Sequence, residues 1–273
     1  MNLLRLRTDK YRQRYLKWHN GYEKRATTEL QRVFRKWAGE LQLHGQPNQW
    51  VHQMDSSFDE EDLIKAYIKI YTEIGLVHAN RVGRLANVGK KNYVPDFFKQ
   101  VWERYVALYM QQSLLSKLFD VRNEFIKYLA EVLLRSQPMI GSDPSTVATW
   151  IHKQSRKRSF YRWQALRIAR TESTAASNLA GHKAVEESGF LMDKIWVSAQ
   201  DGRTRRKPED WYDHYHMNGK AVKMNEKFVM QGRGGEDALE FPGDPKGHPA
   251  NIINCRCTLI YKPRKVNGRL VRQ

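Results

Sequence analysis

The two cysteines of the sequence are the residues best suited to bind a soft metal ion. Cys255 and Cys257 are one residue apart, and side chains at positions i and i+2 of a strand project from the same face, so the thiols could converge on one point. Zinc takes four such ligands in a closed site and contributes folding free energy to a small module, so structural zinc is the one candidate cofactor. The histidine ligands would be His214 with either His216 or His248. The alternative is a pair of buried, reduced thiols beside a hydrogen-bonded histidine.

The segment from residue 153 to residue 170 has the residue types of a phosphate-binding surface. It carries seven lysines and arginines and no acid, with the rings of Phe160, Tyr161 and Trp163 among them. Cations at this density neutralise phosphates and release counterions, and exposed rings can stack on bases. The alternative is an ordinary solvated helix face whose rings point into the core. The predicted DNA-binding residues are Lys153, Arg156, Lys157, Arg158, Arg162 and Arg167.

Two acids and a histidine could form a catalytic group. Glu172, Asp201 and His214 have the side chains that a metal-dependent nuclease or phosphotransfer enzyme uses. The competing interpretation is an ionic network that joins a helix to the first strand, formed by Arg170, Glu172, Asp201 and Arg205. Such networks fix the register of elements more reliably than they add stability. We favour the network and therefore predict no catalytic residue.

Five short motifs follow one another in the second half of the chain: ARTE at 169–172, WVSAQDGRTR at 196–205, HYHMNG at 214–219, FPGDP at 241–245 and INCRC at 253–257. In this order they make the segment from Leu166 to Tyr261 resemble the head-morphogenesis domain of phage minor head proteins, the Mu F-like family. The chain departs from the family spacing by an insertion from Arg206 to Asp213, so His216 could replace His214. The motif residues with an implied structural role are Arg170, Thr171, Glu172, Asp201, Thr204, Arg205, His214, Gly219, Pro242, Gly243, Asn254, Cys255 and Cys257.

The resemblance implies a minor head protein of a tailed bacteriophage and not an enzyme. Such a protein is expected in the virion, inside the capsid near the portal, and in the host cytoplasm during assembly. Its implied partners are the portal protein and double-stranded DNA, with the major capsid or scaffolding protein as further candidates. The implied role is in head assembly, DNA packaging or genome ejection. The alternative function is the nuclease or phosphotransfer enzyme described above.

The elements that must position these residues form an α+β fold. Residues 1–158 are predicted to be a body of long helices, because apolar residues recur at three- and four-residue steps. The first helix extends to about Glu40, either unbroken or broken near Gly21. A loop follows from residue 44 to residue 55, and Ser57 and Glu60 form a capping box for the second helix. A third long helix extends from residue 98 to residue 134, with Pro95 in its first turn.

Residues 159–262 are predicted to form a small α+β module. Asp143 caps a short helix, and the next helix extends from residue 160 to residue 188 and ends at Gly189. Strands are expected at residues 194–200, 221–230 and 255–261, where β-branched and aromatic residues alternate. The last segment, residues 263–273, contains four cations and no acid, which predicts a flexible basic tail.

The charge of the chain indicates a polyanionic partner. It has 47 lysines and arginines against 29 acids, a formal net charge of +18, which is more than solubility requires. The sequence has no apolar run of about 18 residues that would span a bilayer and no signal-peptide pattern, so we expect no membrane partner and a cytoplasm-like compartment. Nucleic acid is therefore the expected polyanion.

Overall fold

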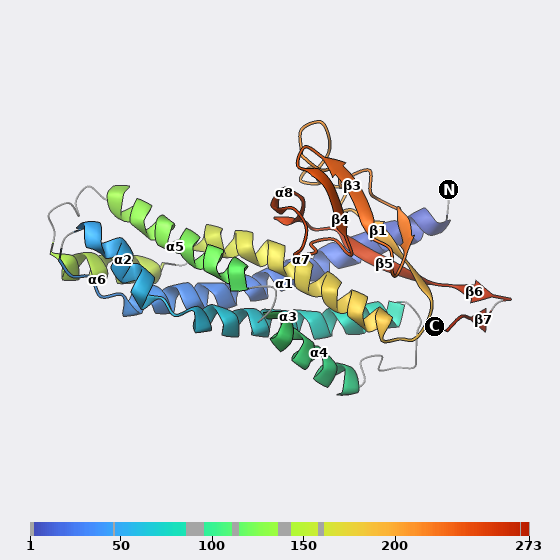
Figure 1. Cartoon of the computed structure of the whole chain (residues 1–273), viewed down its shortest axis with the longest axis horizontal. Coiled ribbons are helices and arrows are strands. Elements are labelled where there is room, and N and C mark those ends of the chain that lie inside the picture. Colours follow the sequence, from blue (N-terminus) through green and yellow to red (C-terminus); the bar gives the residue numbers. More distant parts are fainter. Residues whose placement is uncertain are drawn as a thin grey trace. The chain divides into compact units, whose positions relative to one another are not determined.

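The computed structural model describes residues 3–45, 47–85, 96–110, 115–135, 143–157, 161–267 and 269–272 (Figure 1). The fold is α+β, as predicted, with long helices followed by small antiparallel sheets. The helices are α1 (Leu3–Glu40), α2 (Pro47–Ser57), α3 (Glu60–Leu85), α4 (Asp96–Tyr109), α5 (Leu115–Arg135), α6 (Pro144–Ser155), α7 (Arg162–Glu186) and α8 (Pro249–Ile252). The strands are β1 (Met192–Val197), β2 (Ala221–Lys223), β3 (Phe228–Gly232), β4 (Gly235–Leu239), β5 (Thr258–Pro263), β6 (Lys265–Val266) and β7 (Arg269–Leu270).

The chain divides into two compact units, and neither is one continuous stretch. The first unit contains Met1–Arg25, Ile70–Val106 and Arg167–Gln273, and the second contains Ala26–Lys69 and Ala107–Leu166. Helices α1, α3, α4 and α7 each contribute residues to both units. The units therefore differ from the predicted ranges 1–158 and 159–262, because parts of α1, α3 and α4 group with residues 167–273.

The sheet of the first unit has β1 between β2 and β5, all antiparallel. Its register pairs Ile195 with Ile260, and Trp196 with Leu259. The start of α1 packs on this sheet, where the buried rings of Tyr11 and Tyr15 contact Val197. Burial of these apolar surfaces joins the amino-terminal helix to a sheet more than 170 residues away in sequence.

The core of the second unit is a cluster of aromatic side chains. Phe34 stacks on Phe125 with ring centroids 4.4 Å apart, and Trp37 stacks on Phe58 at 5.1 Å. Tyr161 adds a ring whose centroid lies 5.1 Å from that of Phe125. Aromatic pairs in these geometries stabilise a core beyond their area burial.

The helix boundaries confirm several predictions and correct others. α1 is unbroken through Gly21. Asp143 caps α6, as predicted, by accepting from the N–H groups of two residues in the first turn. The predicted loop at residues 44–55 is wrong, because most of it forms α2. The predicted capping box is also wrong, since Asp59 accepts from the N–H of Glu61 while Ser57 remains inside α2.

The end of the chain is paired and not a flexible tail. β6 and β7 form an antiparallel hairpin. The N–H of Leu191 donates to the carbonyl of Val271 at 2.9 Å, and the N–H of Arg264 donates to the carbonyl of Leu191 at 2.9 Å. The predicted flexible arm is corrected, because composition alone did not reveal these backbone hydrogen bonds.

The predicted third helix corresponds to α4 and α5, and Pro95 lies outside the described residues. α7 ends at Glu186, and Gly189 follows with a φ of +66°, as the predicted helix end requires. None of the described helices has an apolar stretch long enough to cross a bilayer.

Candidate functional site

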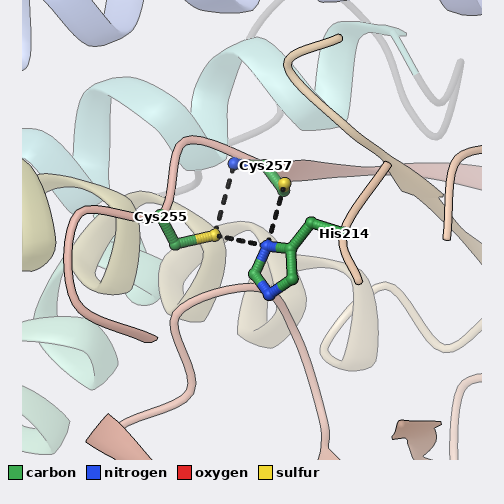
Figure 2. Close-up of side chains that lie close together, drawn as sticks. All are labelled: His214, Cys255 and Cys257. Carbon is green, nitrogen blue, oxygen red and sulfur yellow. Dashed lines mark hydrogen bonds between the residues drawn. The ribbon is translucent and has the colours of Figure 1, made fainter. Parts of the chain in front are cut away.

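Cys255, Cys257 and His214 form one buried cluster. Figure 2 shows the imidazole of His214 turned toward both sulfurs, and its Nδ1 lies 3.5 Å from each Sγ. The ligand atoms of all three residues lie within 4.8 Å of one another, and each residue is 2% exposed. In the part of the chain that the structure describes, this is the only group of three or more metal-ligating side chains close enough to share an ion.

The cysteines lie in the loop between α8 and β5, before the strand begins. The predicted explanation for their convergence, two positions on one face of a strand, is therefore wrong. Asn254 adopts a positive φ of 58°, and the N–H of Cys257 donates to the Sγ of Cys255 at 3.5 Å. The tight loop, and not the strand, brings the sulfurs to one point.

Helix α7 holds this loop through its own buried polar side chains. Asn178 donates from Nδ2 to the carbonyls of Cys257 and Pro242, at 2.9 Å each, and its Oδ1 accepts from the hydroxyl of Thr258 at 2.9 Å. The hydroxyl of Thr174 donates to the carbonyl of Cys255. A helix with small and polar residues on its buried face can approach a loop closely and satisfy its carbonyls.

A chain of hydrogen bonds orients the imidazole of His214. Nε2 of His214 lies 2.5 Å from Oδ1 of Asn251, and Nδ2 of Asn251 donates to Oδ2 of Asp237 at 2.7 Å. Because Asn251 presents an acceptor, Nε2 of His214 is the protonated nitrogen in this network. Nδ1 therefore has a free lone pair, and this lone pair faces the two sulfurs.

The two thiols have different proton affinities. A hydrogen bond from Cys257 lowers the pKa of Cys255 well below its ordinary value, and the neighbouring His214 and the charge of Arg205 act in the same direction against burial. Burial raises the pKa of Cys257 well above its ordinary value, against the N–H groups of Ala199 and Trp196. Cys255 is thus the first of the pair to become a thiolate.

The other two candidate histidines are outside the cluster. His216 is exposed, and its Nδ1 lies 2.7 Å from a carboxylate oxygen of Asp213. His248 caps α8, where its Nδ1 accepts from the N–H of Ala250 at 3.1 Å, and its ring stacks on Trp211. His214 is therefore the histidine that the structure brings to the cysteines.

The four residues of the predicted ionic network have partners outside that set. Arg170 pairs with Glu23 at 3.5 Å, and Glu172 accepts from the hydroxyl of Tyr71 at 2.7 Å. Asp201 accepts two hydrogen bonds of 2.6 Å from Arg256, and Arg205 donates to the carbonyl of Ile253. The acids that would serve a nuclease, Glu172 and Asp201, are thus held in separate contacts.

The remaining motif residues shape the backbone near the cluster. Gly219 and Gly243 have positive φ angles of 85° and 77°. A Cβ at Gly243 would lie 2.9 Å from Cγ2 of Thr174, so only glycine fits against α7 there. The hydroxyl of Thr171 accepts from the N–H of Asn254 at 3.0 Å, and that of Thr204 accepts from the N–H of Asp201 at 3.0 Å.

The predicted DNA-binding cations are largely exposed. Four of the six predicted cations are exposed and belong to the second unit: Lys153, Arg156, Lys157 and Arg162. Arg167 belongs to the first unit and is half-buried, and Arg158 lies outside the described residues. Trp163 is 65% exposed, but Tyr161 is 2% exposed in the aromatic core. The ring of Tyr161 therefore points into the core, as the alternative interpretation of this segment predicted. Phe160 lies outside the described residues.

Sequence reasoning missed the residues that position the cluster. Asn251, Asp237, Asn178 and Thr174 are polar residues with no motif of their own. Their partners lie 14 to 81 residues away in sequence, so no local spacing indicates them. The one signal in the sequence is the run of small and polar residues ESTAASN at 172–178, which the structure buries within α7.

The chain contains a phage head-related domain. Residues 139–260 match the family described as phage Mu protein F like protein, and this range includes α6, α7, β1, β2, the start of β5 and the Cys–His cluster. These residues are similar to that family, which confirms the resemblance inferred from the five motifs.

Two relatives are similar to the chain over part of their length. The chain is 29% identical over 152 residues, 55% of its length, to a protein of Enterococcus faecalis (strain ATCC 700802 / V583) named NAD(+)--arginine ADP-ribosyltransferase EFV. It is 31% identical over 100 residues, 37% of its length, to a protein of Bacillus subtilis (strain 168) named Uncharacterized protein YqbB. The matched parts are 28% and 31% of these relatives, so the chain spans less than a third of their length. No solved structure matches the chain.

Proposed function

We propose that the protein is a minor head protein of a tailed bacteriophage that lies near the portal vertex and contacts packaged DNA without reading its sequence. The observation that carries the proposal is the phage Mu F-like domain in a chain with a net charge of +18. Inside a capsid the principal polyanion is the genome, and cations that neutralise phosphates bind it in any sequence.

The exposed cations from the end of α6 to the start of α7 are the proposed DNA contact. Lys153, Arg156, Lys157 and Arg162 are exposed within a segment that has no acid from residue 153 to residue 170. Since no neighbouring carboxylate in this segment competes for them, phosphates can approach. The exposed ring of Trp163 lies in the same segment and could contact a nucleotide.

Binding of the purified chain to duplex DNA at increasing salt tests this contact. We expect affinity to fall steeply with salt and to be similar for unrelated sequences. A variant with alanine at the four exposed cations should reduce the magnitude of the slope of log K against log salt by about three to four. The control removes four cations of the same unit that are paired with acids, Arg32, Lys65, Lys69 and Lys127.

The control variant has the same net charge as the test variant, so it separates a local contact from a general charge effect. Equal loss of affinity in the two variants would assign binding to overall charge and not to the α6–α7 segment. Absence of DNA binding by the unmodified chain at low salt would refute the DNA part of the proposal.

The portal part of the proposal has a separate test. We expect the protein to sediment with assembled portal rings and to occupy density near the portal in a map of the intact virion. Failure to associate in a reconstituted procapsid would refute it.

We propose a structural role and no enzymatic activity for this chain. The transferase activity in the name of the Enterococcus relative is stated for a protein of which this chain matches 28%. We expect plasmid DNA to remain intact with Mg²⁺, Mn²⁺ or Zn²⁺, and we expect no transfer of label from NAD⁺ to an arginine-containing protein. Plasmid cleavage that His214→Ala abolishes would favour the nuclease instead.

A further inference from the structure

We propose that Cys255, Cys257 and His214 bind one zinc ion, which joins the loop before β5 to the loop that carries His214. The proposal goes beyond the function proposed above and does not depend on it. It rests on the geometry of the three side chains and on the groups that surround them (Figure 2).

The hydrogen bonds of His214 leave its Nδ1 as a ligand atom. Asn251 uses its amide to donate to Asp237, so it offers only its oxygen to Nε2 of His214. The lone pair of Nδ1 can accept one thiol hydrogen, yet both sulfurs lie 3.5 Å from it. A single cation between the three atoms satisfies all of them at once.

The spacing of the ligand atoms matches tetrahedral zinc. Zinc bonds of about 2.3 Å to sulfur and about 2.0–2.1 Å to nitrogen, at a tetrahedral angle, place the nitrogen and sulfur about 3.6 Å apart. Both observed distances from Nδ1 to sulfur are 3.5 Å. Two thiolates and an imidazole select a soft or borderline ion over magnesium or calcium.

The groups around the cluster are those that tune a zinc site. Metal-binding histidines commonly donate their other ring N–H to an oxygen that is itself held by further hydrogen bonds, as Asn251 and Asp237 provide here. The N–H of Cys257 donates to the sulfur of Cys255. The buried ring of Trp196 packs against the imidazole of His214, with the two ring centroids 5.5 Å apart.

Charge balance also favours zinc at this buried position. Binding replaces the thiol hydrogens of Cys255 and Cys257, which leave as two protons, while His214 binds in its neutral form. The Zn²⁺ ion and two thiolates together carry no net charge, so the complete unit can be buried without an unpaired charge. The described residues supply three ligands, and we assign the fourth position to a water molecule, which leaves the unit neutral.

The ion would cross-link segments with little regular structure. His214 is 41 residues from Cys255 and 43 from Cys257 in sequence, and residues 198–220 contain no helix or strand. Ligands brought together only by folding make metal binding a source of folding free energy. The predicted fourth ligand, His216 or His248, is not part of the site.

Metal content of the full chain, purified in reducing buffer after growth with zinc, tests the proposal. We expect one zinc per chain by elemental analysis, and we expect Co²⁺ added to the metal-free chain to give the visible bands of a tetrahedral thiolate site. The Cys255→Ser, Cys257→Ser variant should lose the zinc, while the control His216→Ala, in the same loop but outside the cluster, should retain it.

A second variant separates a metal role from a folding role. Asn251→Ala leaves the three ligands in place, so it should retain one zinc at saturation but bind it on the order of 10- to 100-fold more weakly. Wild-type protein with neither zinc nor a cobalt spectrum would refute the proposal even if the cysteine variant fails to fold. Retention of a full zinc equivalent in the double cysteine variant would refute it as well. A zinc-free chain that still binds DNA would leave the head-protein proposal intact.

Discussion

Asn178 is the residue whose removal should most disturb the cluster without touching its ligands. It is 1% exposed, and its amide makes three hydrogen bonds of 2.9 Å to Pro242, Cys257 and Thr258. Asn178→Ala removes all three and leaves two carbonyls and a hydroxyl buried without this partner. Each buried group left unsatisfied costs about 1–3 kcal/mol, and three groups lose this partner, so we expect a loss of at least about 3 kcal/mol in the free energy of unfolding.

Urea denaturation with hydrogen exchange of peptides from α7 and β5 measures this loss in the first unit. Total stabilities are about 5–15 kcal/mol, so the expected change is large enough to measure. The control is Asn225→Ala, at an exposed turn between β2 and β3, which should change stability by less than about 0.5 kcal/mol. A loss below about 1 kcal/mol for Asn178→Ala would refute the argument that α7 holds the cysteine loop through this amide.

Two further predictions concern residues of the same unit. Gly243→Ala should lower the free energy of unfolding by about 1–3 kcal/mol, because its φ is +77° and the new Cβ would lie 2.9 Å from Cγ2 of Thr174. The control is Gly202→Ala, where a new Cβ meets open space, so it should have little effect. Thermal denaturation of both variants measures the difference. Burial lowers the pKa of Lys194 to about 8, so above this pH the folded state has released a proton that the unfolded state keeps up to about pH 10.4. Stability should therefore rise between these pH values relative to Lys194→Met, and parallel pH profiles of the two proteins would contradict this.

The helices could largely be predicted from sequence, because their signals are local. Apolar residues at three- and four-residue steps predicted α1, and the side chain of Asp143 predicted the start of α6. The wrong predictions occurred where short-range signals compete. A polar stretch with Pro47 was interpreted as a loop, although proline also suits the first turn of a helix, and α2 begins there.

The site could be predicted in part. Residue type alone identified the cysteines and His214 as partners, since few side chains bind soft metals. It could not choose between His216 and His248 for a further ligand, because the choice depends on Asp213 beside one and on the cap of α8 around the other. The ionic partners of Arg170 and Asp201 were likewise undetermined, because Glu23 and Arg256 lie far from them in sequence.

Composition and short-range order were enough to predict the α+β class, the excess of positive charge and the resemblance of five motifs to a phage head-related family. Long-range packing, in contrast, places the start of α1 on the carboxy-terminal sheet and pairs β6 with β7 in a hairpin. It also decided that Asn251 and Asp237 orient His214 toward two thiols. The physical reason is that each of these contacts joins residues that are distant along the chain, and only packing of the folded chain brings them together.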